Sequence, residues 1–191
     1  LQLLKYTDYN IDNSIIYYAG LFHDIGKSKI KLDVLNKKRS LSESEIALLK
    51  THPLVGYDIL SKYELPNEIP LSARLHHERI NGSGYPNALT DRQIPPIVRI
   101  ISICDVFDAL TSDRPYRKAY DFEKALKIMK NSPGEFDTQL FNLFLKKDLT
   151  SKTGSDYLSI NRLVGLSRFH TSHPHGEPTQ CTTAADTSLI V

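Results

Sequence analysis

The chain has 191 residues, a formal net charge of +2 and two cysteines. This length suits one domain with a buried core and a tail, and the near-neutral charge argues against a protein that coats a polyanion such as DNA or RNA, so an anionic ligand would have to be bound locally. Cys104 in an apolar run and Cys181 in a polar segment make no disulfide framework, which fits a reducing compartment and predicts a cytoplasmic protein.

The first predicted helix begins at residues 12–14, a cluster of good N-cap residue types, and runs to a His23-Asp24 pair. Apolar residues recur at helical spacing with His23, so His23 is expected on the buried face. A lone buried histidine is most often a core residue hydrogen-bonded to the backbone. A histidine beside a carboxylate near a core is costly unless something cationic lies between them, and the pair therefore predicts a metal site.

The second predicted helix follows an irregular basic connection at residues 29–39. Residues 42–45, Ser-Glu-Ser-Glu, have the Ser-x-x-Glu spacing of a capping box and open this helix. Two apolar residues and then His52 follow at three-residue steps, which aims His52 inward. Because Pro53 breaks the helix, His52 is expected at a helix end with its ring turned toward a cavity.

The third predicted helix, residues 67–80, places His76 and His77 on the same face as three aliphatic residues. Two adjacent imidazoles on an apolar face would suppress each other's protonation and leave nitrogens unpaired, and metal ligation is the simplest remedy. Glu78 and Arg79 fall off this face and are expected to be surface charges.

A glycine-rich loop and a long helix follow. Residues 81–86, Asn-Gly-Ser-Gly-Tyr-Pro, predict a tight exposed loop, either a simple turn or a loop that touches a ligand bound at the metals. Pro95-Pro96 then opens a helix whose inward stripe includes Asp105. A metal shared with the histidines would be a partner for this carboxylate, and a buried N-cap or a salt bridge is the alternative. The apolar run at residues 97–110 contains charged residues and cannot span a bilayer.

The remaining chain completes an all-α prediction. Arg114 and Arg117 suit bidentate contact with phosphate or guanine, while a solvated basic turn is the ordinary alternative. Helices are expected at residues 122–129 and 138–145, and no segment has the alternation of a strand. Residues 151–191 are expected to be a disordered tail, because their last part is rich in serine and threonine and has little periodicity.

Together these patterns predict a metal centre built from separate helices, which is how a helical bundle assembles a multinuclear site. Histidine and carboxylate ligands without cysteine suit iron or manganese. Two ions about 3.5–4 Å apart would turn a bridging water into hydroxide and clamp an in-line displacement at phosphorus, so phosphoester hydrolysis is expected. Lys27 would neutralise charge on a phosphate oxygen. The predicted ligands are His23, Asp24, His52, His76, His77 and Asp105.

These motifs closely resemble the HD-GYP subgroup of the HD phosphohydrolase superfamily over residues 11–145. The matching stretches are His-Asp-Ile-Gly-Lys at 23–27, His-Pro at 52–53, His-His-Glu-Arg at 76–79, Gly-Ser-Gly-Tyr-Pro at 82–86, the Asp105–Thr111 helix segment and Arg-Pro-Tyr-Arg at 114–117. The resemblance implies an HD-domain helical bundle within residues 1–150. It also implies a bacterial phosphodiesterase that hydrolyses cyclic di-GMP to linear pGpG or to GMP with two or three iron or manganese ions.

By the same resemblance, the six predicted ligands bind the ions, with Asp24 bridging them, and Lys27 assists at the scissile phosphate. A diguanylate cyclase-type partner at the Gly84-Tyr85-Pro86 loop and a homodimer are further expectations. The tyrosine of the loop would stack on a base, and the arginines would hold guanine or phosphate. The residues expected to line the substrate pocket are Tyr85, Pro86, Asp108, Arg114 and Arg117.

One departure from the family leaves a second function open. The family carries a further metal-binding histidine roughly thirty residues before the His-Asp pair, and residue 23 leaves no room for it. We therefore expect either an N-terminally shortened chain or a lost ligand. In the second case the domain would be a silent module that binds cyclic di-GMP or docks a cyclase. A hydrolase of another nucleotide, such as a deoxynucleoside triphosphate, is disfavoured by the loop and by residues 114–117.

Overall fold

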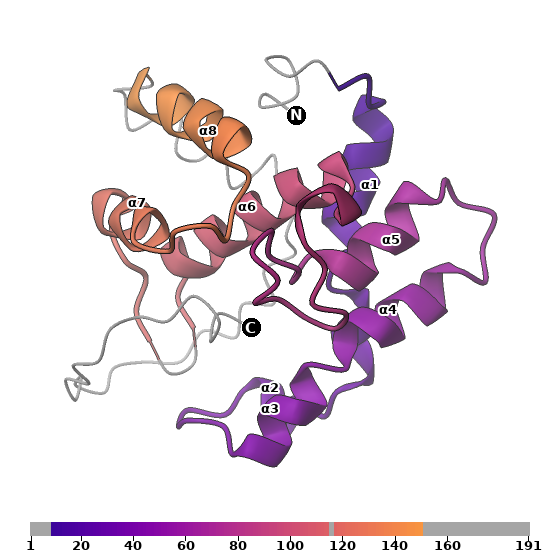
Figure 1. Ribbon diagram of the computed structural model, residues 1–191. Helices are drawn as coiled ribbons and strands as arrows, with labels where there is room; N and C mark the ends of the chain where they lie inside the picture. The colour runs from indigo at the N-terminus through magenta and orange to yellow at the C-terminus, as the bar shows by residue number, and fades with distance from the viewer. Residues whose placement is uncertain (1–8, 115–116, 151–191) are drawn as a thin grey trace.

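The computed structural model describes residues 9–114 and 117–150, and every regular element in these residues is a helix (Figure 1). The all-α prediction is therefore confirmed. Outside the helices, the described residues form two isolated β-bridges, between Asn81 and Thr90 and between Arg114 and Arg117, and no strand. The tail predicted to be disordered lies outside the described residues, and the boundary near residue 150 stays a prediction.

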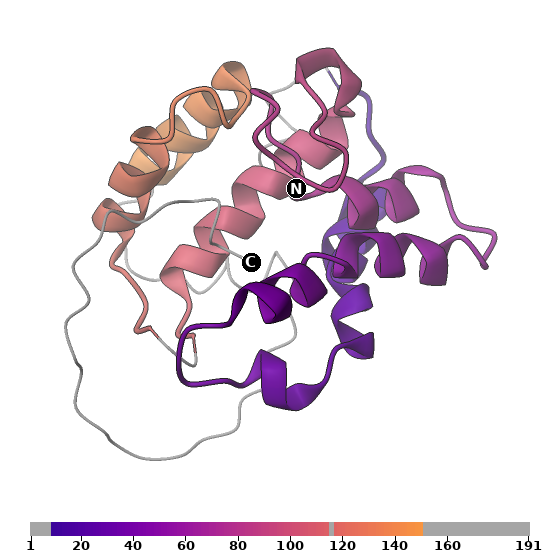
Figure 2. The same ribbon diagram turned by 60° about the horizontal axis from the view of Figure 1, so that its bottom comes forward.

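Helix α6 (Pro96–Thr111) is the central element of the bundle. Its apolar residues lie all round the helix rather than on one stripe, which is the pattern of a helix packed on several sides. Helices α1 (Asn13–Phe22) and α5 (Glu68–Leu75) contact it on one side, and α7 (Phe122–Lys130) and α8 (Thr138–Thr150) on the other (Figure 2). Helix α4 (His52–Leu60) packs behind α5.

The helix starts expected from the sequence are formed by local hydrogen bonds. Asp12 caps α1 by accepting from the Ser14 N–H at 2.6 Å. Ser42 and Glu45 form the predicted capping box of α3 (Glu43–Leu49). These side chains satisfy backbone N–H groups that have no partner inside the helix, so the helix starts can be read from sequence.

Two short helices, α2 and α3, form an arm of the molecule, and α2 was not predicted from the sequence. The connection expected to be irregular contains α2 (Leu32–Leu35), whose backbone bonds close locally, with the Asn36 N–H donating to the Leu32 carbonyl at 2.8 Å. Helix α2 buries no residue and α3 buries only Leu49. The arm therefore projects from the bundle at the bottom of Figure 1 and returns to it at Leu49.

The 3₁₀ helix η2 (Ile25–Lys29) packs directly on α4 through Gly26. A methyl group added at Gly26 would overlap the His52 carbonyl and lie 2.6 Å from the Gly56 nitrogen. Real side-chain atoms do not approach a backbone so closely. Glycine at residue 26 therefore lets the His23-Asp24 pair come beside His52.

None of the helices in the described part of the chain has both the length and the apolar character needed to cross a membrane.

We expect Gly26→Ala to lower the free energy of unfolding by more than about 2 kcal/mol, because the added methyl displaces backbone rather than a flexible side chain. Urea denaturation followed by circular dichroism measures this change. Gly20→Ala is the matched control in α1, where an added methyl meets nothing within 4 Å. That variant should be neutral or more stable by up to about 1 kcal/mol. Equal losses in the two variants would contradict the close packing of η2 on α4.

Candidate metal centre

The predicted ligands come from four helices and meet beside α6. His23 and Asp24 follow α1, His52 is the first residue of α4, His76 and His77 follow α5, and Asp105 lies within α6. The four histidines are buried, with at most 3% of each side chain exposed. The convergence predicted from the sequence is therefore present in the fold.

Four of these side chains form a first group, which consists of Asp24, His52, His76 and His77. The Nε2 atom of His52 lies 3.2 Å from Nε2 of His76 and 3.2 Å from Nε2 of His77. The Oδ1 atom of Asp24 lies 3.2 Å from the His52 Nε2 and 3.5 Å from the His76 Nε2. One oxygen and three imidazole nitrogens thus face a common point.

A second group consists of His23, His76 and Asp105. The His23 Nε2 lies 3.6 Å from Oδ1 of Asp105 and 3.4 Å from Oδ2 of Asp24. His76 belongs to both groups, and the two oxygens of Asp24 face one group each. Such sharing suits two ions held side by side.

The imidazole rings are oriented by carbonyls at helix ends. The Nδ1 atoms of His23, His52 and His76 lie 2.6, 2.7 and 3.0 Å from the carbonyls three residues earlier. A carbonyl only accepts, so each Nδ1 carries the proton and each Nε2 of a neutral ring presents a lone pair. The 3.2 Å contact between the Nε2 atoms of His52 and His76 is then a contact between two acceptors. A cation between them turns this repulsion into ligation, and an Nδ1–H bond of this kind is the usual support of a ligating histidine.

Burial and charge give the histidines different protonation. Burial disfavours the imidazolium and lowers the pKa of His76 to about 4, and it holds the pKa of His77 well below the ordinary value. His23 is buried too, but the neighbouring carboxylates of Asp24 and Asp105 outweigh burial and raise its pKa to about 10. His76 and His77 are therefore neutral at pH 7, whereas a metal ion bound at His23 would have to displace its proton.

The carboxylates are held ionised. Burial opposes the charge of Asp24, but Lys27 and His23 outweigh it and keep the pKa of Asp24 well below the ordinary value. Asp105 is likewise buried, and its contact with His23 keeps the pKa of that carboxyl low. The centre therefore combines anionic oxygens with the neutral nitrogens of His76 and His77, the ligand types that iron and manganese accept.

Two buried atoms support the presence of a cation. The His23 Nε2 and the Asp24 Oδ1 have no hydrogen-bond partner among the described residues. Buried polar atoms without a partner are rare and costly. Divalent ions bound by the two groups would satisfy both atoms, so the residues fit the metal centre that the sequence predicts.

Lys27 and Tyr85 lie against the ligands. The Lys27 ammonium donates to Oδ2 of Asp24 at 2.9 Å. The Tyr85 ring stacks on the His77 imidazole with 4.7 Å between centroids and 15° between planes. Pro86 follows through a cis peptide bond. Both predicted catalytic side chains, Lys27 and Asp24, and the loop predicted to bind substrate thus border the same centre.

The predicted substrate-binding residues at and after the end of α6 have different surroundings. Arg117 donates to the carbonyls of Ala109, Leu110 and Lys118 and lies over the Tyr120 ring, so its guanidinium caps α6. Burial and the charge of Asp105 raise the pKa of Asp108, whose Oδ1 lies 3.4 Å from the Ser112 hydroxyl. The residues between Arg114 and Arg117 lie outside the described chain. The substrate roles of Asp108, Arg114 and Arg117 stay predictions.

The expectation that Glu78 and Arg79 are surface charges is wrong. Glu78 is 2% exposed, and its carboxylate accepts from the backbone N–H groups of Asn87 at 2.7 Å and Leu89 at 2.9 Å. Arg79 is 5% exposed and donates to the Ser102 hydroxyl at 2.8 Å. The prediction extended the helical face to residue 80, but α5 ends at Leu75 and the following turn directs both side chains inward.

Gly84 brings this loop against the ligand segment. A methyl group added at Gly84 would lie 2.5 Å from the His77 carbonyl and 2.5 Å from the Glu78 Cα. Only glycine allows this approach. The loop therefore packs on the backbone of the ligand His77 while Glu78 holds its far end.

Comparisons with known proteins agree with this geometry. The model of the family described as HD domain matches residues 6–140. A cyclic di-GMP phosphodiesterase of Pseudomonas aeruginosa is 41% identical over 67% of this chain and 31% of its own length. A cyclic di-GMP phosphodiesterase response regulator of Xanthomonas campestris is 40% identical over 69% of this chain and 36% of its own length. A 3'3'-cGAMP-specific phosphodiesterase of Vibrio cholerae is 35% identical over 76% of this chain and 34% of its own length.

A solved structure shares the fold. It is described as a HDG"Y"P protein from Bdellovibrio bacteriovorus, and it aligns with a TM-score of 0.59 and 25% identity over 74% of this chain and 45% of that chain. The resemblance stated from the motifs is thus confirmed. The chain spans about a third of the length of the curated relatives that it matches.

We expect His76→Ala to reduce bound iron or manganese more than Asp105→Asn, because His76 serves both ligand groups and Asp105 serves one. Metal content per chain is measured by mass spectrometry of the elements after anaerobic loading and desalting. Asp58→Asn, an exposed carboxylate of α4, is the control and should bind metal as the unmodified protein does. Unchanged metal content in a folded His76→Ala variant would contradict the shared-ligand arrangement.

We expect Glu78→Ala to lower the free energy of unfolding by about 2–4 kcal/mol, because two loop N–H groups lose a charged acceptor. Thermal and urea denaturation measure the loss. Glu64→Ala, an exposed glutamate in the turn after α4, should change stability by less than about 0.5 kcal/mol. The inward position of Glu78 would be refuted by equal, small effects of the two substitutions.

Proposed function

The chain belongs to the HD domain family, and on this premise we propose that it is a metal-dependent phosphodiesterase that hydrolyses cyclic di-GMP to linear pGpG or GMP. The observation that carries the proposal is the pair of ligand groups that share His76 and present both oxygens of Asp24. A two-metal site is suited to in-line displacement at phosphorus. The names of the curated relatives support a cyclic dinucleotide as the substrate.

In this proposal the ions are iron or manganese, two or three in number. Asp24, His52, His76 and His77 would hold one ion, and His23, His76 and Asp105 another, with Asp24 between them. When bound, such ions supply Lewis acidity to a phosphoryl oxygen and lower the pKa of an attacking water.

Lys27 is proposed to act at the scissile phosphate. Its ammonium donates to Asp24 at 2.9 Å, and 21% of its side chain is exposed to solvent. A fixed cation at that position can neutralise charge that develops on a phosphate oxygen without moving during the reaction. Asp24 has two roles in the proposal, since it holds the ions and it orients Lys27.

The Tyr85-Pro86 loop is proposed to line the substrate pocket. His77 stacks on the Tyr85 ring and the Lys50 ammonium lies over the same ring, so a guanine base would contact the ring at its edge. Arg114 and Asp108 stand near one another at the end of α6, where a guanidinium and a carboxyl can bind a guanine base. Arg117 would support this region through the carbonyls it caps.

Two other functions remain candidates for specific reasons. Relatives from Vibrio cholerae are named as 3'3'-cGAMP-specific phosphodiesterases, which favours testing that dinucleotide beside cyclic di-GMP. A silent module that binds the dinucleotide or docks a cyclase through Gly84-Tyr85-Pro86 stays the alternative prediction. The homodimer and the cytoplasmic location stay predictions.

Hydrolysis by the anaerobically loaded protein tests the proposal. We expect chromatography to show pGpG or GMP from cyclic di-GMP, and we expect Lys27→Met to lower kcat by about 100-fold with metal content unchanged. Lys29→Met, at the exposed end of η2, is the matched control and should keep full activity. Removal of the metal by a chelator should abolish turnover.

The outcomes separate the three candidates. If the protein hydrolyses 3'3'-cGAMP and not cyclic di-GMP, the substrate is 3'3'-cGAMP. Dinucleotide binding without product, at full metal occupancy, would identify the silent module. Neither binding nor turnover would reject both functions.

A further inference from the structure

We propose that Lys50 binds the phosphate that is not being cleaved, and so determines specificity for diesters that carry two phosphates. The inference deepens the proposed function and rests on it. It starts from the juxtaposition of a half-buried ammonium, the loop tyrosine and a metal ligand. Lys50 belongs to none of the motifs that carry the family resemblance.

The backbone of Lys50 is fixed relative to the metal centre. Lys50 caps the C-terminus of α3 and donates its N–H to the Ile46 carbonyl at 2.9 Å. The preceding residue, Leu49, is buried, and its carbonyl binds Nδ1 of the ligand His52 at 2.7 Å. Only Thr51 thus separates Lys50 from the predicted metal ligand His52, and the backbone of Lys50 and the ring of His52 are both held by hydrogen bonds.

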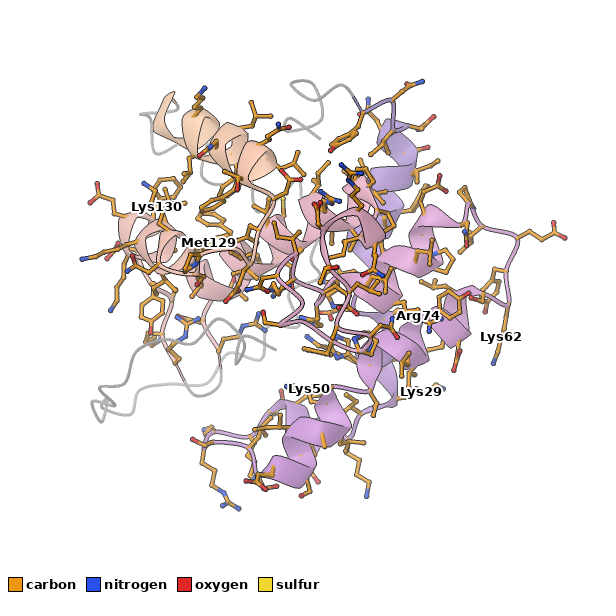
Figure 3. All side chains as sticks on the ribbon, viewed as in Figure 1. Lys29, Lys50, Lys62, Arg74, Met129 and Lys130 are labelled. Atoms are coloured by element: carbon orange, nitrogen blue, oxygen red, sulfur yellow. The ribbon has the colours of Figure 1, made fainter. Side chains whose placement is uncertain are left out.

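The side chain of Lys50 reaches the loop on the other side of the centre. Its Nζ lies 5.0 Å from the centroid of the Tyr85 ring, within cation–π range. The same ring stacks on His77. Figure 3 shows Lys50 at the end of α3 that faces the bundle, whereas Lys62 lies at the edge of the molecule. Lys50 therefore stands at the rim of the proposed substrate pocket.

The charge of Lys50 is not matched by an anion. Lys27 pairs with Asp24 and Lys37 pairs with Glu45, but the ammonium of Lys50 has no carboxylate or carbonyl partner within residues 9–114 and 117–150. Its N–H donors are therefore available to a ligand. A half-buried cation with open donors beside a site for a phosphodiester suits a second anionic group on that substrate.

The chemistry of a cyclic dinucleotide supplies this group. It contains two phosphodiesters, and only one can be attacked at the metals at a time. The other phosphate loses water when the pocket closes around it, so it needs a compensating cation. Lys27 is held by Asp24, and Arg117 is held by carbonyls. Lys50 is the lysine that borders Tyr85 and is not already bound in these ways.

The test compares a diester with two phosphates and a diester with one. Lys50→Met keeps a long unbranched side chain and removes the charge. Its KM for cyclic di-GMP should rise about tenfold, the loss of one charge-assisted contact, with kcat changed less than about twofold. Its KM for bis(p-nitrophenyl) phosphate should stay within about twofold, because that diester has no second phosphate. Lys50→Arg should restore the KM for cyclic di-GMP, and Lys62→Met should match the unmodified protein.

Several results would overturn the assignment. An unchanged KM for cyclic di-GMP in Lys50→Met would show that the ammonium does not touch the substrate. Equal increases in KM for both diesters would mean that Lys50 acts at the scissile phosphate or that it stabilises the fold. A lower denaturation midpoint of Lys50→Met would identify the second case.

A failure of the proposed function is distinguishable from a failure of this inference. If neither diester is hydrolysed, the affinity for cyclic di-GMP measured by calorimetry tests Lys50 directly. Lys50→Met should bind about tenfold more weakly than the unmodified protein, and Lys62→Met should bind with unchanged affinity. Equal affinities of the two variants would reject the role of Lys50 alone, whereas no binding by any of the proteins would reject the proposed function and the role of Lys50 with it.

Discussion

The centre depends on one repeated interaction, in which a histidine at a helix end donates from Nδ1 to the carbonyl three residues earlier. His23, His52 and His76 do this at the last turns of α1, α3 and α5. Carbonyls in a last turn have no intrahelical donor, so the imidazole satisfies a group that would otherwise need water. The bond also fixes the ring and its tautomer, and it leaves the Nε2 lone pair for a metal. One local device therefore ends a helix and prepares a ligand.

Close backbone contacts bring the three helix ends together. Gly26 lets η2 lie on α4, and Gly84 lets the loop lie on the segment of His77 and Glu78. Glu78 adds the hydrogen bonds that hold residues 87 and 89, so the loop with Tyr85 is tied to the chain next to a ligand. The glycines that look like simple turn residues in the motifs are thus packing residues. Their role is to remove side-chain bulk where two backbones meet.

Charge explains how the same site could hold cations and bind the proposed dinucleotide. Asp24 and Asp105 place two buried carboxylates among neutral imidazoles, and burial of such charges is stable only with cations beside them. Lys27 supplies one cation from within the chain, and the metals that fit the two groups would supply the others. At the rim, the Lys50 ammonium approaches Tyr85 and adds a positive charge. A substrate with two phosphates complements that distribution.

The sequence by itself determined helix starts such as those of α1 and α3, because the caps Asp12 and Ser42 and the spacing of apolar residues act within a few residues of one another, but it did not predict α2 or the end of α5. It also determined which of the described histidines face inward, since each lies on an apolar face. It misplaced Glu78 and Arg79, and it did not distinguish Lys50 from other lysines or show that Arg117 caps α6. Those properties arise from contacts between segments far apart in the chain. Only the tertiary structure decided them, because the end of α5, the packing at Gly84 and the return of the α3 arm set which side chains meet.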